Sequence, residues 1–194
     1  MSAIPPSFSA ADSSPALSFD PVLLLQAQGV RVAFFDVDGV LTGGEIIYTN
    51  GGEEAKAFNI KDGWAIVEAK KHGFITGIIT GRSSELVAKR AKELKIDFLV
   101  QGELKKADAY ERFKAEYYLK DEEIAYIGDD LIDLPILTRC GFAVCPFDAN
   151  DEVKSRVHLI SRFEGGKGAA REMIEEVLKK KGLWDEIVNG FRCK

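Results

Sequence analysis

The sequence predicts an α/β fold: a Rossmann-like parallel sheet with helices on both faces, capless (without a lid domain), and with a β-hairpin that projects after the first strand. Three observations predict this fold. Short apolar runs recur along the chain, as expected for parallel strands that are buried on both faces. Amphipathic helical segments separate these runs, as crossover connections require. Asn50-Gly51 lies between two strand-like segments and marks the hairpin.

The expected strands are short and rich in β-branched and aromatic residues. They are 31–35, 74–80, 97–100, 123–128, 142–145 and 156–160. The expected helices between them combine apolar residues at helical spacing with charged ones. They are 62–73, 83–95, 106–119 and 131–141, and a shorter helix at 21–28 precedes the first strand.

The segment 43–59 interrupts this alternation, and its two strand-like halves flank a turn at 49–52. A lone hairpin is marginally stable in water and exposes unpaired edges, so we expect it to pack against another surface, possibly a second subunit. Between Asp38 and Thr80 the chain has room for only this hairpin and one helix. No separate lid domain is therefore expected.

Composition restricts the class of protein. With 194 residues, 46% of them hydrophobic, the chain can bury one core, so 21–194 is expected to form a single domain. Segment 1–20 is small, polar and proline-bearing, which is typical of a disordered leader. It has neither the basic nor the apolar region of a signal peptide, and no segment reads as a membrane span. A cytoplasmic location is therefore expected.

Charge and cysteine content exclude further classes. The net charge is −5 and basic residues do not cluster, which argues against nucleic acid as a partner. Three cysteines, Cys140, Cys145 and Cys193, lack the spacing of a zinc site, and their odd number argues against a disulfide framework. We expect reduced thiols.

Polar residues follow several of the predicted strands. Asp36 and Asp38 follow the first, Thr80-Gly81-Arg82 the second, Lys105-Lys106 the third, and Gly128-Asp129-Asp130 with Asp133 the fourth. Ligands of open parallel sheets collect beyond the carboxyl ends of the strands. The fold should therefore gather carboxylates, a hydroxyl and an ammonium around one crevice.

These groups suit phosphoryl transfer. Asp36 is expected to attack phosphorus, and Mg²⁺, held by Asp36, Asp129 and the backbone carbonyl of Asp38, would reduce its repulsion from the phosphate. The Asp38 side chain is expected to protonate the leaving alcohol and then to take a proton from the attacking water. Thr80 would bind the phosphoryl oxygens, and a lysine after the third strand would neutralise their charge.

These residues resemble the haloacid-dehalogenase-like phosphatases. Four motifs match in order over roughly residues 30 to 182: DxDGxxT from Asp36 to Thr42, Thr80-Gly81-Arg82, a lysine near Lys105-Lys106, and GDDxxD from Gly128 to Asp133. The resemblance implies an Mg²⁺-dependent phosphomonoesterase that works through an aspartyl-phosphate, with Gly81, Asp130 and Asp133 in supporting positions.

The closer resemblance is to the 3-deoxy-D-manno-octulosonate (KDO) 8-phosphate phosphatases of lipopolysaccharide biosynthesis. It rests on Glu53-x-x-Lys56-x-Phe58-Asn59, on Gln101-Gly102-x-x-x-Lys106, on YIGDDLID and on the glycine-rich segment 165–172. The resemblance selects Lys106 over Lys105 as the phosphate-binding lysine. It also implies a phosphorylated sugar acid as substrate and a homotetramer in which the hairpin covers a neighbouring site.

Such a substrate carries a carboxylate and hydroxyls besides its phosphate, so cationic side chains should line the approach. The candidates are Arg82, Lys167, Lys56 and Lys61. His72 and His158 lie far from the motifs and are expected to be structural. Lys105 is expected to be solvated.

The alternatives to this function are another phosphatase and proteins of other classes, among them a phosphomutase, which would need a lid or a long-lived phosphorylated enzyme. A phosphatase for a nine-carbon sugar acid 9-phosphate shares the scaffold, but the position of Arg82 tends to be acidic there. A non-catalytic assembly or regulatory module often loses a catalytic carboxylate, whereas Asp36, Asp38 and Asp129 are all present. A signalling receiver would carry its acceptor after the third strand, where this chain has Gln101-Gly102, and is rejected.

Overall fold

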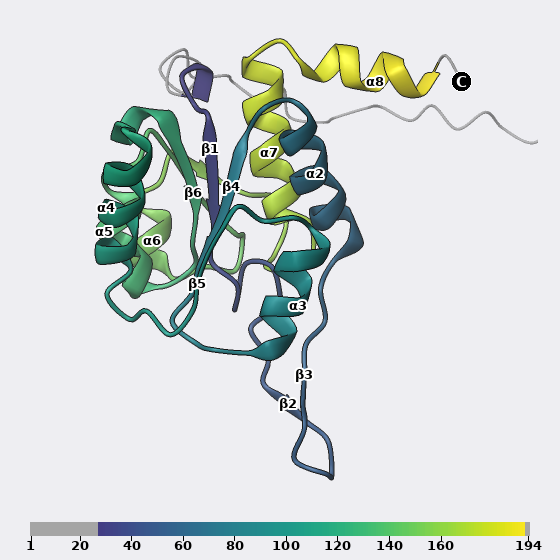
Figure 1. The fold of residues 1–194 in the computed structure, drawn as a ribbon, viewed down its shortest axis with the longest axis vertical. Coiled ribbons are helices and arrows are strands. Elements are labelled where there is room, and N and C mark those ends of the chain that lie inside the picture. Colours follow the sequence, from purple (N-terminus) through teal and green to yellow (C-terminus); the bar gives the residue numbers. More distant parts are fainter. Residues whose placement is uncertain (1–26, 193–194) are drawn as a thin grey trace, which may run out of the picture.

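The computed structural model describes residues 27–192, which form one parallel sheet between two layers of helices (Figure 1). Its strands are β1 (Val32–Phe35), β4 (Ile75–Ile79), β5 (Phe98–Val100), β6 (Ile124–Ile127), β7 (Phe142–Cys145) and β8 (Leu159–Ile160). Their order is β5-β4-β1-β6-β7-β8, and every neighbouring pair is parallel. The predicted α/β class is confirmed. The expected leader at 1–20, most of the expected helix at 21–28 and Cys193 lie outside the described residues.

The side chains of β1 alternate between two cores, which explains why its sequence is apolar throughout. Val32 and Phe34 join the core on one face of the sheet, and Ala33 and Phe35 join the core on the other. The Phe34 ring makes edge contacts with Phe113 at a centroid distance of 4.8 Å. Such a contact adds about 0.5–1.5 kcal/mol to the stabilisation from burial.

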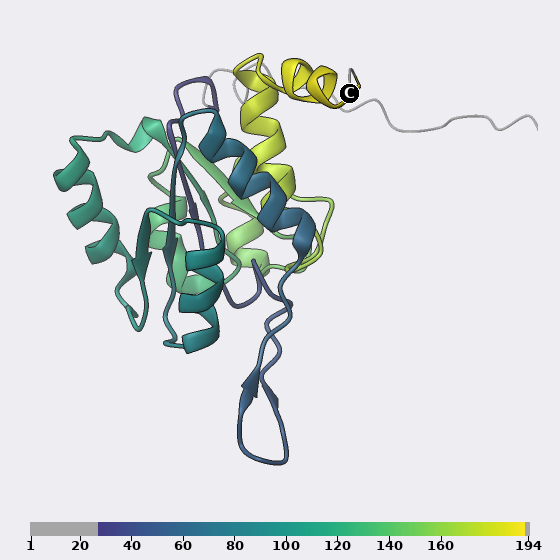
Figure 2. The same cartoon turned by 45° about the vertical axis from the view of Figure 1, so that its right-hand side comes forward.

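Helices cover both faces of the sheet (Figure 1). The side chains of α2 (Ile60–Lys71), α3 (Glu85–Glu93) and α7 (Ala169–Lys180) enter the core with Ala33 and Phe35. Those of α4 (Lys106–Tyr117), α5 (Leu134–Leu137) and α6 (Asp151–Lys154) enter the core with Val32 and Phe34. The last helix, α8 (Trp184–Arg192), lies at the opposite end of the molecule from the hairpin (Figures 1 and 2). Within the described range, no helix is long and apolar enough to cross a membrane.

The strand order places β1 at the point where the chain reverses its direction across the sheet. From β1 the chain moves to β4 and β5 on one side, and then returns to β6, β7 and β8 on the other. Loops on the two sides of such a point diverge, which leaves a crevice at the carboxyl ends of the strands. The residues that follow β1, β4 and β6 therefore surround one site.

The hairpin consists of β2 (Ile47–Tyr48) and β3 (Glu54–Ala55), which pair antiparallel and project from the carboxyl end of the sheet (Figure 2). Asn-Gly is typical of two-residue turns, but the turn here is longer. The Thr49 N–H donates to Glu53 O (2.9 Å), and Gly52, with φ of +83°, occupies the left-handed position between them. The turn thus has three residues, in which glycine accepts the positive φ at little cost.

Two expected elements differ from the structure. The helix predicted for 131–141 is split into a 3₁₀ turn, η2 (Leu131–Asp133), and the short α5, because Pro135 lacks an N–H and fits only the first turn of a helix. The strand predicted for 156–160 shortens to Leu159–Ile160, because the Arg156 N–H still donates to Val153 at the end of α6. The sequence analysis assigned no helices to the segments that form α6, α7 and α8, nor to the 3₁₀ turn η1 (Asp121–Glu123).

Candidate active site

Asp36 follows directly after β1 at the chain reversal. Its N–H donates to Ile127 O (3.0 Å), which extends the pairing with β6 and fixes the start of the loop. The residue is 5% exposed, and its Oδ2 lies 2.8 Å from Nζ of Lys106, the buried first residue of α4. The structure therefore brings together the predicted nucleophile and the predicted phosphate-binding lysine.

Asp133 holds the same ammonium from the other side. Its Oδ1 lies 2.6 Å from Lys106 Nζ and accepts a hydrogen bond from the Tyr126 hydroxyl (2.5 Å). Its Oδ2 accepts from the N–H groups of Asp129 (3.1 Å) and Asp130 (3.3 Å). Both oxygens of this fully buried carboxylate are thus occupied. Asp133 is therefore in a position to orient Lys106 and the Asp129 loop rather than to bind a ligand.

The donors available to a metal ion are Asp36 and Asp129. With Asp133, they present carboxylate oxygens within 4.8 Å of one another. Oδ1 of Asp36 is buried and has no hydrogen-bond partner among residues 27–192. A buried carboxylate oxygen without a partner is costly, and a cation would remove that cost. Hard oxygen donors of this kind fit Mg²⁺. The Asp38 carbonyl as a further ligand remains a prediction.

The carboxyl groups of this cluster have raised pKa values. Burial and the charge of Asp133 raise the pKa of Asp36 to about 6, although Lys106 opposes the shift. Burial and the charges of Asp36 and Asp133 raise the pKa of Asp129 to about 8. Burial lowers the pKa of Lys106, but the two carboxylates beside it outweigh this effect and raise it. The cluster thus lacks positive charge, which a divalent cation would supply.

Asp38 lies two residues beyond Asp36, and its carboxylate forms an ion pair with Lys56 from the base of the hairpin. The Lys56 side chain is 1% exposed, whereas that of Asp38 is 22% exposed and reaches the pocket. Gly39 has φ of +83°, and a Cβ there would lie 2.1 Å from Asp129 Oδ2. Only glycine lets this loop pass so close to Asp129.

A pocket of 280 Å³ opens over these groups. Its lining residues come from the loops after β1, β4 and β6: Asp36, Asp38, Gly39, Gly44, Thr80, Gly81, Arg82, Asp129, Asp130 and Ile132. Thr80 is buried and fixed by its N–H, which donates to Val100 O (3.0 Å). Arg82 is half-exposed and donates from Nη2 to Glu54 Oε1 (2.9 Å). Seven of the predicted residues thus surround one cavity.

The remaining cationic candidates do not line this pocket. Lys167 is exposed, although its glycine-rich turn packs on the Asp38 loop, where the Gly166 N–H donates to Val40 O (2.8 Å). Lys61 is exposed on α2 and lines a separate groove beside Trp64. Lys56 forms ion pairs with Asp38, which lines the pocket, and with Glu54. Lys105 is exposed, as the sequence predicted.

Two residues of this site, Glu54 and Tyr126, were not predicted from the sequence. Glu54 binds Arg82 and lies two residues before Lys56, so the two side chains share a face of the hairpin arm, and this alternation is the signal that could have found it. Tyr126 is fully buried in a strand that is otherwise aliphatic, and a buried phenol needs an acceptor. Burial and the charge of Asp133 raise its pKa well above the ordinary value.

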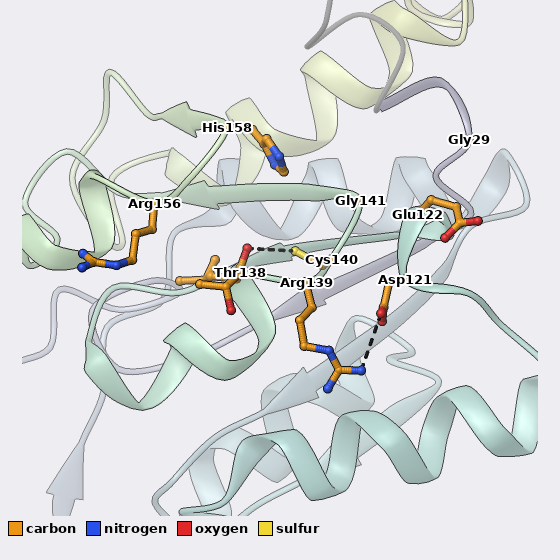
Figure 3. A pocket seen from close by; sticks show the side chains of 10 residues that line it. Gly29, Asp121, Glu122, Thr138, Arg139, Cys140, Gly141, Arg156 and His158 are labelled. Carbon is orange, nitrogen blue, oxygen red and sulfur yellow. Dashed lines mark hydrogen bonds and ion pairs between the residues drawn. The ribbon is translucent and has the colours of Figure 1, made fainter.

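The structure also contains a larger cavity, of 590 Å³, at the opposite end of the sheet (Figure 3). It lies at the amino ends of β6 and β7, and its lining includes Arg139, Arg156 and His158. The two arginines are already paired, Arg139 with Glu111 and Asp121 and Arg156 with Glu152. His158 accepts a hydrogen bond from the Ala143 N–H (2.8 Å), which gives it a structural role. None of the predicted catalytic residues lies there.

Both the sequence and the fold that form this site can be compared with those of known proteins. A family model for haloacid dehalogenase-like hydrolases matches residues 98–173. The 3-deoxy-D-manno-octulosonate 8-phosphate phosphatase KdsC of Escherichia coli (strain K12) is 38% identical over 181 residues, which cover 92% of this chain and 96% of that protein. This chain belongs to the haloacid dehalogenase-like phosphatases.

Solved structures of other haloacid dehalogenase-like phosphatases have the same fold. A "probable yrbi family phosphatase" from Pseudomonas syringae pv. phaseolica 1448a superposes with a TM-score of 0.88 at 37% identity, and the match covers 90% of this chain and 99% of that one. Another solved structure is a 3-deoxy-D-manno-octulosonate 8-phosphate phosphatase from Moraxella catarrhalis, in complex with a magnesium ion, a phosphate ion and a KDO molecule. It superposes with a TM-score of 0.85 at 36% identity, and the match covers 87% of this chain and 97% of that one. The present protein is a phosphatase with Mg²⁺ as cofactor, and its free carboxylate oxygens fit that ion.

Proposed function

We propose that this phosphatase hydrolyses 3-deoxy-D-manno-octulosonate 8-phosphate to the free sugar acid and phosphate in lipopolysaccharide biosynthesis. The observation that carries the proposal is the juxtaposition of Asp36, with a free buried oxygen, and the Lys106 ammonium 2.8 Å away, below a pocket with Arg82 at its wall. Asp36 and Lys106 suit a phosphoryl group, and Arg82 suits a carboxylate. Names of relatives at 36–38% identity support the same substrate.

In this mechanism a carboxylate oxygen of Asp36 forms a bond to phosphorus while the bond from phosphorus to the sugar oxygen breaks. Asp38 gives its proton to the departing oxygen, then takes a proton from water, which attacks phosphorus and releases Asp36. Lys106 and the Thr80 hydroxyl bind the phosphoryl oxygens, and Lys56 keeps Asp38 in place. Asp36 and Asp129 would hold Mg²⁺ here, and the ion would supply positive charge to neutralise the phosphoryl oxygens.

The first experiment measures phosphate release, with and without Mg²⁺, from the eight-carbon acid 8-phosphate, the nine-carbon acid 9-phosphate and ordinary sugar phosphates. We expect kcat/KM to be higher for the two sugar acid phosphates than for ordinary sugar phosphates, because Arg82 pairs with the substrate carboxylate. Between the two acids we expect the eight-carbon acid to be preferred, because relatives at 36–38% identity are named for it. Preference for the nine-carbon acid would identify the protein as a nine-carbon sugar acid 9-phosphate phosphatase instead. Release from no substrate would favour the non-catalytic assembly module.

We also propose a homotetramer, assembled through the hairpin, in the cytoplasm. Three exposed apolar residues lie at the hairpin, Ile46, Ile47 and Tyr48, and three more lie near Gly81 and η2 beside the pocket, Leu104, Leu131 and Ile132. Exposed apolar side chains on two surfaces of one chain can cover each other between copies. The free thiols of Cys140 and Cys145 agree with a reducing compartment. Sedimentation of the protein and of Tyr48→Lys tests this assembly, and a wild-type monomer with full activity would exclude it.

A further inference from the structure

A chain of charged side chains connects the hairpin to the pocket, and Glu54 is its centre. Oε1 of Glu54 accepts from Arg82 Nη2 (2.9 Å) and lies 3.6 Å from Lys56 Nζ. Its Oε2 accepts from the Ser84 hydroxyl (2.9 Å). Glu54 thus connects Lys56, just after β3 of the hairpin, with Arg82 and Ser84 in the segment before α3.

Ser84 provides a second, independent observation. It is the N-cap residue of α3, where a serine hydroxyl usually accepts a hydrogen bond from the first turn of its own helix. Here the side chain makes no such bond and instead donates to Glu54. The hydroxyl also holds the pKa of Glu54 below its ordinary value, so the carboxylate stays charged. The Ser84 hydroxyl therefore orients the Glu54 carboxylate instead of capping α3.

The hydrogen bond from Arg82 to Glu54 affects a residue of the pocket itself. Arg82 lines the pocket, whereas Glu54 does not. An arginine has five N–H donors, and the bond to Glu54 uses one of them. Because the Arg82 side chain is 40% exposed, it would sample several rotamers without this anchor. The anchor leaves the other donors free for an anionic group in the pocket.

We propose that Glu54 is a positioning residue that fixes Arg82 at the pocket mouth, and that this pair selects phosphomonoesters with a second anionic group, a carboxylate. The inference rests on the proposed function and names the pair of residues that would recognise the acid group of its substrate. Glu54 acts through Arg82 and touches no reacting atom.

The test compares Glu54→Gln with wild type on two substrates, the sugar acid phosphate and p-nitrophenyl phosphate, which has no carboxylate. We expect KM for the sugar acid phosphate to rise about tenfold, with kcat changed by less than about twofold, because one charge-assisted bond is lost. The KM for p-nitrophenyl phosphate should stay unchanged. Ser84→Ala should change KM in the same direction by a smaller factor, because it removes one arm of the anchor without changing charge.

Two comparisons separate positioning from a general structural effect. Glu93→Gln removes an exposed Arg90–Glu93 pair on α3 (3.3 Å) and serves as the matched control, which should leave both substrates unaffected. In an Arg82→Ala background, Glu54→Gln should have no further effect on KM, because the two residues act as one unit. Equal changes for both substrates, an unchanged KM, or additive effects of the two substitutions would overturn the proposal.

A substrate-independent measurement distinguishes this proposal from the proposed function. Nitrogen-15 relaxation at Arg82 Nε, assigned by its loss in Arg82→Ala, should report a more mobile side chain in Glu54→Gln than in wild type. If wild type does not prefer the sugar acid phosphate but Arg82 loosens in this variant, the substrate is wrong and the anchor stands. If Arg82 is equally mobile in both proteins, the anchor is wrong whatever the substrate.

Discussion

At the scale of single residues, the site depends on charges that compensate each other only as a set. Lys106 lies between Asp36 and Asp133, and Asp129 adds a third carboxyl group beside them. Burying one ammonium with several carboxylates is unfavourable unless each has a partner or a function. Asp133 has four partners, whereas Asp36 keeps an oxygen without one. This difference separates a supporting carboxylate from a reactive one.

Asp36→Asn should abolish turnover while the fold persists. The amide is not a nucleophile, so phosphate release should fall by at least about a thousandfold. The substitution also removes one of the crowded carboxyl groups, so the melting temperature should stay within a few degrees of wild type. Phosphate release and thermal unfolding by circular dichroism measure the two effects. Retained turnover would contradict the role of Asp36 as nucleophile.

Asp133→Asn should destabilise the protein as well as inactivate it. The substitution leaves Lys106 without its fully buried partner and directs an amide NH₂ group towards backbone donors. Breaking a buried pair in this way costs about 3 kcal/mol. Asp130→Asn is the control, because Asp130 is exposed and should change stability by less than about 0.5 kcal/mol. Equal unfolding midpoints in urea for the two variants would contradict this account.

At the scale of elements, short loops rather than whole helices set the geometry of the site. The loop after β1 turns at Gly39 and carries Asp38 past Asp129. The glycine-rich turn at 165–166 packs against the same loop, and the first residue of α4 supplies Lys106. The hairpin contributes Lys56 and Glu54 from its base. The functional groups therefore come from loops and from the ends of elements.

Gly39→Ala tests the geometry of the first loop. A methyl group there would lie 2.1 Å from Asp129 Oδ2, in a backbone region that alanine rarely adopts. Asp129 must move, so we expect the apparent Mg²⁺ affinity in the activity assay to fall by about tenfold or more. Gly52→Ala is the matched control, because Gly52 has the same φ but open space around it. Unchanged Mg²⁺ dependence in Gly39→Ala would show that the loop adapts freely.

At the scale of the whole molecule, two cores on one sheet hold the loops that meet at the chain reversal. The core residues of β1 belong to both cores, so the strand that precedes Asp36 is held from both faces of the sheet. The hairpin and α8 lie at opposite ends, so the last described helix does not reach the active site of its own chain (Figure 2). Among residues 27–192, α8 thus does not cover the mouth of the pocket.

Stability should depend on pH and Mg²⁺ together. In the metal-free protein the pKa values of Asp36 and Asp129 are raised from 3.8 to about 6 and about 8, so the folded state binds more protons than the unfolded state between these values. The free energy of unfolding should therefore fall as pH rises from about 4 to about 8. The raised pKa of Lys106 does not contribute in this window, because this lysine is charged throughout.

Added Mg²⁺ should raise the melting temperature more at pH 8 than at pH 5, because protons compete with the metal for these carboxylates. Thermal unfolding at both pH values, with EDTA and with excess Mg²⁺, measures the effect. Asp36→Asn should weaken this dependence. A metal-induced shift that is larger at pH 5 than at pH 8 would contradict the assignment of the two carboxylates.

Much of the site could be predicted from the sequence because parallel strands share an edge. Knowing that Asp36, Thr80 and Asp129 each follow a buried strand was enough to expect them around one crevice, and they line one pocket. The prediction of 131–141 as one helix was wrong because it followed the helical spacing of the apolar residues and disregarded Pro135. Lys61 was predicted at the site by resemblance, but the first turn of α2 directs it to another groove.

By itself, the sequence determined the α/β class, the order of the strands along the chain and the polar residues at their ends, because these depend on local patterns of side chains. Only the tertiary structure decided which charges meet: Lys106 between two carboxylates, Lys56 against Asp38, and Glu54 holding Arg82. The physical reason is that ion pairs form over a few ångströms, whereas the residues of these pairs are between 18 positions (Asp38–Lys56) and 70 positions (Asp36–Lys106) apart in the sequence. Their distances are set by the approach of the hairpin and α4 to the sheet.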